Sequence, residues 1–170
     1  LRDESGDFIE NYSPSKIVTI TYTETSVTVS PDIIDQVSYT IVDKTHLMIN
    51  SSRSKMVYRI QGTSSNGSLK IYSEKKFQLA MLGVNLTNPK GPAINIQSGK
   101  TVYVTLAANK TNTLCDGETY AEPPYDNGEP EDQKGTLFSE GKVMIDGYRN
   151  GSGTLNVTSL GGHASCSDDY

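Results

Sequence analysis

Apolar and polar residues alternate along most of this 170-residue chain, in short runs separated by polar bends. The clearest example is the segment 91–106, GPAINIQSGKTVYVTL, in which two alternating runs flank a bend at 98–100. Alternation with a period of two is typical of strands that have one buried face. Similar runs, rich in Val, Ile, Thr and Tyr, occur at 17–22, 26–30, 37–42, 46–50 and 56–60. The pattern predicts an all-β protein.

The alternating runs also recur along the chain. A glycine introduces each unit, at Gly67, Gly91, Gly135 and then Gly161 or Gly162. The first spacing is 24 residues and the last is 26 or 27, and the middle spacing of 44 becomes similar if a polar insertion at 116–134 is removed. Short strands with a period in the twenties are typical of a solenoid. The repeat therefore predicts a parallel β-helix, with regular coils over 67–170.

Equivalent apolar residues of successive units are expected to stack on three walls of such a solenoid. The first wall contains Leu69, Ile94 and Leu137, the second Phe77, Val102 and Val143, and the third Leu86, Leu114 and Val157. An antiparallel sandwich has the same alternation and stays an alternative, although it would place Asn-Gly or Asp-Gly at most of its hairpins. Those dipeptides occur at 66–67, 116–117, 127–128, 146–147 and 150–151.

The remaining segments divide the chain into a leader and one domain. Residues 1–14 are polar and predict a flexible leader, and 15–170 a single domain whose strands at 15–66 form its first coils and cap. The formal net charge is −5 and the pI about 5.0, so no electrostatic case exists for nucleic acid or an anionic membrane as partner. No apolar run reaches the length of a transmembrane helix, and the N-terminus LRDESGDF lacks the features of a signal peptide.

Several segments together resemble a known family. They are GVNLTN (83–88), GPAINIQSGKTVYVTL (91–106), NKTNTLCDGETY (109–120), KGTLFSEG (134–141), NGSGTLNVT (150–158) and HASCSDDY (163–170). In this order they resemble the secreted carbohydrate-binding proteins of Bacteroidetes and clostridia that have a pectate-lyase-like β-helix. The resemblance covers roughly 57–170.

The resemblance implies a right-handed parallel β-helix that binds a polysaccharide or other glycan without catalysis and without a cofactor. It also implies a bacterial protein located outside the cell, at the cell surface or in the periplasm. Family members usually continue beyond the segment equivalent to 167–170. An uncovered solenoid end at 150–170 is therefore expected to self-associate, because unpaired strand edges pair with other chains.

The polar insertion is the candidate binding site. Its segment 117–134, GETYAEPPYDNGEPEDQK, concentrates carboxylates and tyrosines outside the expected core. Tyrosine rings stack on sugar faces, and carboxylates accept hydrogen bonds from sugar hydroxyls. We expect a lip over the neighbouring sheet that includes Tyr120, Tyr125, Asp126, Tyr148 and Arg149, and that the core does not need. The same carboxylates offer the oxygen ligands that calcium prefers, and a solvated loop is the simpler alternative.

No residue is assigned a catalytic role. A lyase of pectate-lyase-like fold needs a base, for which Arg59, Lys100, Lys142 and Arg149 are candidates. A glycosidase needs paired carboxylates, for which Asp116, Asp146 and Asp168 are candidates, although all three lie at bends where aspartate is common. None of these residues lies in a motif tied to such chemistry. A polysaccharide lyase or hydrolase and a surface adhesin or structural module are the alternatives to a glycan-binding protein.

Overall fold

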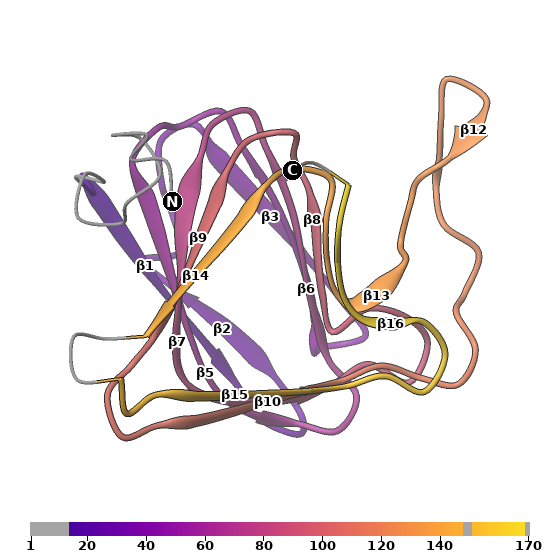
Figure 1. Cartoon of the computed structure of the whole chain (residues 1–170). Helices are drawn as coiled ribbons and strands as arrows, with labels where there is room; N and C mark the ends of the chain where they lie inside the picture. Colours follow the sequence, from indigo (N-terminus) through magenta and orange to yellow (C-terminus); the bar gives the residue numbers. More distant parts are fainter. Residues whose placement is uncertain (1–13, 148–150, 169–170) are drawn as a thin grey trace, which may run out of the picture.

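The computed structural model describes residues 14–147 and 151–168, and it is all-β within those residues (Figure 1). The larger sheet has eight strands. They are β1 (Lys16–Tyr22), β2 (Val27–Ser30), β5 (Met56–Ser64), β7 (Phe77–Thr87), β9 (Val102–Leu106), β10 (Thr111–Cys115), β14 (Val143–Gly147) and β15 (Thr154–Thr158). Its main path runs in the order β14-β9-β7-β5-β1-β2, and β10 joins β7 and β15 beside that path.

The second sheet has six strands, in the order β16-β13-β8-β6-β4-β3. These are β3 (Val37–Val42), β4 (His46–Ser51), β6 (Ser68–Ser73), β8 (Ile94–Gln97), β13 (Gly135–Ser139) and β16 (His163–Ser167). A separate two-stranded hairpin, β11 (Tyr125–Asp126) and β12 (Glu129–Pro130), belongs to the insertion. Figure 1 shows the two sheets on opposite sides of the molecule, with β10 and β15 along one end and the hairpin projecting beyond the six-stranded sheet.

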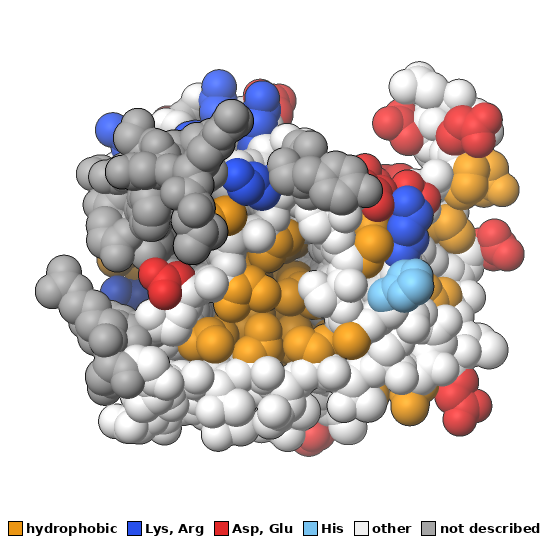
Figure 2. Space-filling model, viewed as in Figure 1, with side chains coloured by type: hydrophobic (Ala, Val, Ile, Leu, Met, Phe, Trp, Pro, Cys, Tyr) orange, Lys and Arg blue, Asp and Glu red, His pale blue; other side chains and the backbone are white. Residues whose placement is uncertain are grey.

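The two sheets share one apolar core. Alternate residues of the central strands point inward, so Leu47, Leu69 and Ile94 of the smaller sheet share a core cluster with side chains such as Ile60 and Leu79 of the larger one, and all are at most 1% exposed. Each fully buried side chain of this kind contributes about 1.5–3 kcal/mol to folding. Figure 2 shows hydrophobic side chains of the interior at the centre of one face, between the two sheets.

The register predicted from the repeat is confirmed. In the six-stranded sheet Leu69 pairs with Ile94, which pairs in turn with Leu137. In the larger sheet Phe77 pairs with Val102, and Val102 pairs with Val143. The third predicted set also lies in register, with Leu114 between Leu86 and Val157. All of these pairings are parallel.

The fold class predicted from the sequence, a right-handed parallel β-helix, is wrong. The structure has mixed sheets in a sandwich-like arrangement, and neither sheet is closed or a solenoid. The sheets are mixed because β2 and β3 pair antiparallel with β1 and β4, which in turn pair in parallel with β5 and β6. The β3–β4 connection turns within three residues because Asp43 and Lys44 both adopt positive φ angles, of 49° and 69°.

The third predicted wall is not a separate sheet either. Strand β7 pairs with β9 through its first half and with β10 through its second half, so β10 and β15 belong to the eight-stranded sheet. A bulge lies between these two halves of β7, where the register of β5 and β7 shifts between Ile60 and Gly62. Gly62 and Gly83 have φ angles of +93° and +89° there, which glycine adopts without strain.

Strands β14, β15 and β16 each pair with only one neighbour among the described residues. Ile145 of β14 is half-exposed, and Val143, Leu155 and Val157 are partly buried against the core. Within 14–147 and 151–168, no second strand covers the other edge of β14, β15 or β16, and an uncovered edge can pair with another chain. Self-association stays a prediction, which sedimentation at increasing protein concentration tests. No helix in 14–147 or 151–168 is long and apolar enough to cross a membrane.

Candidate functional site

Three strands of the six-stranded sheet end in the same way. Strands β4 and β6 end with the triplets Ile49-Asn50-Ser51 and Ile71-Tyr72-Ser73, and the triplet Ile96-Gln97-Ser98 ends one residue after β8. In each triplet the serine hydroxyl accepts a hydrogen bond from the backbone N–H two residues later, at 3.2 Å in all three cases. This local bond bends the chain and ends the strand. The isoleucine points into the core, and the middle residue is the last outward-facing side chain.

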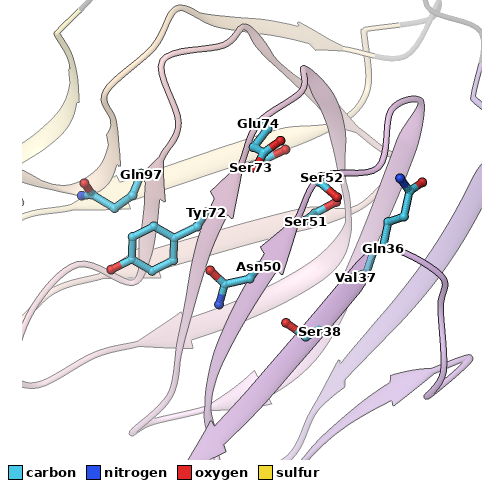
Figure 3. A pocket seen from close by; sticks show the side chains of 10 residues that line it. All are labelled: Gln36, Val37, Ser38, Asn50, Ser51, Ser52, Tyr72, Ser73, Glu74 and Gln97. Atoms are coloured by element: carbon cyan, nitrogen blue, oxygen red, sulfur yellow. The ribbon is translucent and has the colours of Figure 1, made fainter.

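The middle residues form a row across the outer face of the sheet. Ser38 of β3 pairs with Asn50, Asn50 with Tyr72, and Tyr72 with Gln97. Neighbouring strands lie about 4.8 Å apart, so these four side chains span about 14 Å at right angles to the strands. Figure 3 shows them following one another across β3, β4, β6 and β8. We call Ser38, Asn50, Tyr72 and Gln97 the polar row.

Two open cavities lie over the polar row and meet at Tyr72 and Gln97, which line both. The first has a volume of about 590 Å³ and is lined by Gln36, Val37, Ser38, Asn50, Ser51, Ser52, Tyr72, Ser73, Glu74 and Gln97 (Figure 3). The second, of about 480 Å³, is lined by Tyr72, Gln97, Ser98, Gly99, Asp126, Glu129, Pro130, Glu131, Asp132 and Glu140. Together they make one groove on the outer face of the sheet, bounded at one side by the insertion.

Tyr72 is fixed at the middle of this groove. Its hydroxyl donates to Glu131 Oε1 at 2.6 Å, and Lys70 Nζ donates to Glu131 Oε2 at 2.6 Å. The Lys70 ammonium lies 5.0 Å from the centroid of the Tyr72 ring, which is a cation–π contact. Burial and then the hydrogen bond to Glu131 raise the pKa of the Tyr72 hydroxyl, so it stays protonated. The insertion thus orients the aromatic ring that it adjoins.

The far end of the groove is acidic. Carboxylate oxygens of Asp132, Glu140 and Asp168 lie within 4.8 Å of one another, and Glu140 and Asp168 follow β13 and β16 at the positions that continue the polar row. Lys134 Nζ lies 3.0 Å from both Asp132 and Asp168, and these bonds raise the pKa of the lysine. Burial, and then the neighbouring Asp168 and Asp132, raise the pKa of Glu140.

Among the described residues, this acidic end also has the carboxylate geometry that could hold a metal ion. Calcium takes six to eight oxygen ligands, and three carboxylates supply part of such a set. In this structure the ammonium group of Lys134 is bonded to two of the three. That the protein needs no cofactor stays a prediction, with calcium as the alternative.

The insertion is anchored by a buried carboxylate at its start. The side chain of Asp116 is only 1% exposed and accepts hydrogen bonds from Tyr120 Oη at 2.6 Å, Ser159 Oγ at 3.0 Å and the Leu160 N–H at 2.6 Å. Burial alone would raise the pKa of this carboxyl, but the hydrogen bonds outweigh it and hold the pKa below its usual value. Asp116 therefore ties the insertion to the turn that precedes β16.

The insertion also covers part of the sheet. Phe138 of β13 is fully buried although it is not a member of the core cluster between the sheets, and its partner in register on β8, Asn95, is also buried. The Gln97 side chain donates to the backbone carbonyl of Asp132 at 2.7 Å, on the same outer face. The insertion is therefore bonded to the sheet, and that the core folds without it stays a prediction.

Of the five residues predicted as the binding site, the structure describes three, and these three have different surroundings. Tyr120 is directed at Asp116, whereas Tyr125 lies in the projecting hairpin and is 67% exposed. Asp126 lines the second cavity of the groove. Tyr148 and Arg149 lie outside the described residues.

The candidate catalytic residues are dispersed as well. Arg59 lies on β5 of the other sheet, and neither Lys100 nor Lys142 lines the groove. Arg149 lies outside the described residues. Of the candidate carboxylates, Asp116 is buried and already accepts several hydrogen bonds from the protein. Asp146 lies on β14 of the larger sheet, and Asp168 is bonded to Lys134.

The polar row was missed from the sequence, although a signal for it exists. The triplet Ile-x-Ser occurs at 49–51, 71–73 and 96–98, at spacings close to the repeat. A repeated serine that ends strands places the variable middle residue at the same position of each strand. The aligned residues Asn50, Tyr72 and Gln97 are those that such an alignment would have selected.

The chemistry of the groove suits a large polar ligand. Side-chain amides and hydroxyls can donate and accept at once, as sugar hydroxyls do. The Tyr72 ring offers a flat apolar surface between Asn50 and Gln97, and an aromatic face attracts the slightly positive C–H groups of a pyranose ring. Ligand sites combine such surfaces with a few well-placed polar groups.

Comparison with known proteins gives a consistent result. The family model described as carbohydrate-binding domain-containing protein matches residues 43–170. A relative from Acetivibrio thermocellus with the same description is 32% identical over 115 residues, which cover 66% of this chain and 38% of the relative. A solved structure of a polysaccharide lyase-like protein from C. thermocellum, in a gadolinium derivative, has a TM-score of 0.66 and 25% identity over 85% of this chain and 53% of that one.

The chain thus spans about half the length of the solved relative and less of the curated one. Both matches come from a clostridium, as one part of the resemblance implied, and the Bacteroidetes part stays a prediction. The match of the family model extends over three quarters of the chain, including β4, β6 and β8 with the Ile-x-Ser triplets. This chain belongs to the family of carbohydrate-binding domain-containing proteins.

Proposed function

We propose that this protein binds a polysaccharide or other glycan, without catalysis, in the groove on the outer face of the six-stranded sheet. The observation that carries the proposal is the polar row, in which Asn50, Tyr72 and Gln97 lie side by side under two connected cavities. A row of this kind offers hydrogen bonds on both sides of an aromatic ring. It runs across the strands, so an extended sugar chain would lie at right angles to them.

The groove favours binding over lyase or hydrolase chemistry. Its two lysine neighbours, Lys70 and Lys134, are both held in ion pairs and are therefore poor bases. The name of the solved relative, polysaccharide lyase-like, makes a lyase the second candidate. Products with new unsaturated bonds or new reducing ends, after incubation with polysaccharides, would establish that candidate.

We also propose that the protein works outside the cell, at the cell surface or in the periplasm, where polymeric glycans are met. Support comes from the family and from the acidic, polar surface of the chain. Detection of the native protein in fractionated cells tests this location.

A polysaccharide panel tests the binding proposal. The panel contains β-glucan, mannan, galactan, xylan, chitosan, polygalacturonate and alginate, and binding is measured by affinity electrophoresis. We expect at least one polymer to retard the protein, and the double variant Asn50→Ala/Tyr72→Ala to lose that retardation while keeping its circular dichroism spectrum. The variant Arg59→Ala on the other sheet is the control and should bind normally. Binding to no polymer, or unchanged binding by the double variant, would contradict the proposal.

A further inference from the structure

Asn-Gly pairs occur in the chain at 66–67, 127–128 and 150–151, and Asn150 lies outside the described residues. An asparagine followed by glycine can lose its side-chain amide group without an enzyme, and asparagine is accordingly a thermolabile residue. The backbone nitrogen of the glycine attacks the side-chain carbonyl carbon of the asparagine, a step that a Cβ atom on the second residue would hinder. In a folded protein the reaction depends on whether that nitrogen and that side chain are free to meet.

The pair at 127–128 forms the tip of the hairpin β11–β12. Asn127 and Gly128 have φ angles of 49° and 85°, as the two central residues of a tight hairpin turn require. Both residues are exposed, and no atom beyond their chain neighbours lies within 4 Å of the place where a Cβ of Gly128 would stand. The Gly128 N–H donates no hydrogen bond to a residue of 14–147 or 151–168. The reacting nitrogen of this pair is therefore accessible.

Few contacts hold this turn closed. Strands β11 and β12 have two residues each, and one further backbone bond, from the Glu131 N–H to the Pro124 carbonyl at 2.8 Å, joins the two arms at the base of the hairpin. A two-stranded hairpin is marginally stable in water. Figure 1 shows the hairpin projecting beyond the six-stranded sheet. The turn can therefore open locally, which lets Asn127 adopt the backbone conformations that the reaction needs.

The pair at 66–67 has the same two residues in the opposite surroundings. The Gly67 N–H donates to the Thr87 carbonyl at 2.9 Å, and Gly67 is buried. The side-chain oxygen of Asn66 lies 3.1 Å from His46 Nε2. A Cβ atom on Gly67 would lie only 2.9 Å from the Thr45 carbonyl oxygen, so the chain is closely surrounded there. The fold must open before this pair can react.

We propose that Asn127 is a site of spontaneous deamidation, so that the protein acquires aspartate and isoaspartate at the tip of the hairpin as it ages. The Gly128 nitrogen gives up its proton and bonds to Asn127 Cγ, the Cγ–Nδ2 bond breaks, and the amide group takes up a proton and leaves as ammonia. Water then opens the cyclic imide. Attack at the side-chain carbonyl carbon gives aspartate, and attack at the backbone carbonyl carbon gives isoaspartate.

The modification changes the edge of the groove in two ways. Both products carry a new carboxylate between Asp126 and Glu129, which line the second cavity. Isoaspartate also adds one carbon to the backbone, so the turn no longer has the length that pairs Asp126 with Glu129. The hairpin should therefore open more often with isoaspartate than with aspartate at its tip.

Peptide mapping of the folded protein tests the site. Trypsin releases Asn66 in the peptide 60–70 and Asn127 in the peptide 111–134, where fragment spectra distinguish it from Asn112. The protein is kept at mildly alkaline pH and physiological temperature, and mass spectrometry follows the replacement of each amide by a carboxyl group relative to a digest made at the start. We expect Asn127 to react at least about tenfold faster than Asn66, because Asn66 reacts only through an opened form. Equal rates, or faster reaction at Asn66, would overturn the proposal.

The same measurement in urea separates the effect of the fold from that of the local sequence. In the unfolded chain both pairs are exposed, and we expect the two rates to become similar. A difference that persists in urea would come from the neighbouring residues along the chain, and the structural cause given above would be wrong.

Hydrogen exchange tests the consequence for the hairpin. The variant Asn127→Asp carries the new charge without the extra backbone carbon, and an isoaspartyl methyltransferase measures the isoaspartate content of the aged protein. Exchange in 125–130 should be faster in aged protein rich in isoaspartate than in Asn127→Asp, with β8 as the internal reference. Equal exchange in the two proteins would overturn the predicted opening of the hairpin.

Discussion

The two faces of the six-stranded sheet differ completely although the same strands build them. The inner face is a ladder of buried aliphatic side chains, and the outer face carries the polar row. The two are separated by a single step along the chain, in the adjacent pairs Ile49 and Asn50, Ile71 and Tyr72, and Ile96 and Gln97. Because side chains alternate between faces, one strand can stabilise the fold and contact a ligand with neighbouring residues. Folding and binding should therefore respond separately to substitutions one position apart.

The largest expected effect is the difference in stability between two neighbouring positions. Ile49→Ala should lower the free energy of unfolding by about 2–4 kcal/mol, because it leaves a cavity in the core. Ile96→Ala and Val104→Ala should behave in the same way. Asn50→Ala, on the exposed face, should change it by less than about 0.5 kcal/mol. Urea denaturation measures both, and similar losses for Ile49→Ala and Asn50→Ala would contradict the assignment of the faces.

The next effect concerns the anchor of the insertion. Asp116→Asn keeps the shape but loses a charged acceptor of several hydrogen bonds, so we expect a loss of about 1.5–3 kcal/mol at neutral pH. The folded-state pKa of Asp116 is lowered, so its stabilisation is fully present above the unfolded-state value of about 3.9 and is lost as the pH falls through the folded-state pKa. Thermal unfolding of both proteins between neutral and strongly acidic pH should show their difference shrinking in acid. A constant difference would exclude this role.

A smaller effect is expected in ligand affinity at the centre of the groove. Tyr72→Ala should weaken glycan binding by about tenfold or more, equivalent to about 1.4 kcal/mol, because it removes the only aromatic ring of the polar row. Tyr72→Phe keeps the ring and loses only the hydroxyl bonded to Glu131, and should retain most of the affinity. Titration calorimetry with a bound polymer of the panel compares the two. Equal losses in both variants would assign the effect to the hydroxyl and not to the ring.

The smallest effect concerns how firmly the insertion is held. Glu131→Gln removes the charge that pairs with Lys70 but keeps a hydrogen-bond acceptor for Tyr72. The expected loss of global stability is below about 1 kcal/mol, whereas amide hydrogen exchange in the hairpin 125–130 should become faster. Exchange in β8 serves as the internal reference. Unchanged exchange in the hairpin would show that other contacts, such as that of Gln97 with Asp132, suffice.

Much of the fold could be predicted from the sequence. The strand positions follow from the period of two, and the register follows from equivalent apolar residues such as Leu69, Ile94 and Leu137. The sheet topology could not be predicted, because parallel and antiparallel strands share that period. The hairpin at Asp43-Lys44 depends on positive φ angles in residues that rarely adopt them, and the merging of β10 with the larger sheet depends on the bulge at Gly62 and Gly83.

The candidate site was predicted less well, for a physical reason. The insertion does border the groove, and Asp126 does line it. Composition nevertheless cannot tell a tyrosine that faces a ligand from one that satisfies a buried carboxylate. Tyr120 is bonded to Asp116, which in turn depends on Leu160, 44 residues further along the chain. Such distant contacts decide which aromatic side chain remains free, and only the structure identifies Tyr72 as the ring at the centre of the groove.

If the outer face of the six-stranded sheet binds carbohydrate, as we propose, the residues on that face should respond when a polymer is added. The most direct test is a ¹H–¹⁵N NMR titration of the isotopically labelled protein with each soluble polymer of the panel. We expect the largest shift changes on Ser38, Asn50, Tyr72 and Gln97 and on the hairpin β11–β12, with little change around Arg59 on the opposite sheet. Shift changes centred on the eight-stranded sheet, or none with any polymer, would contradict it.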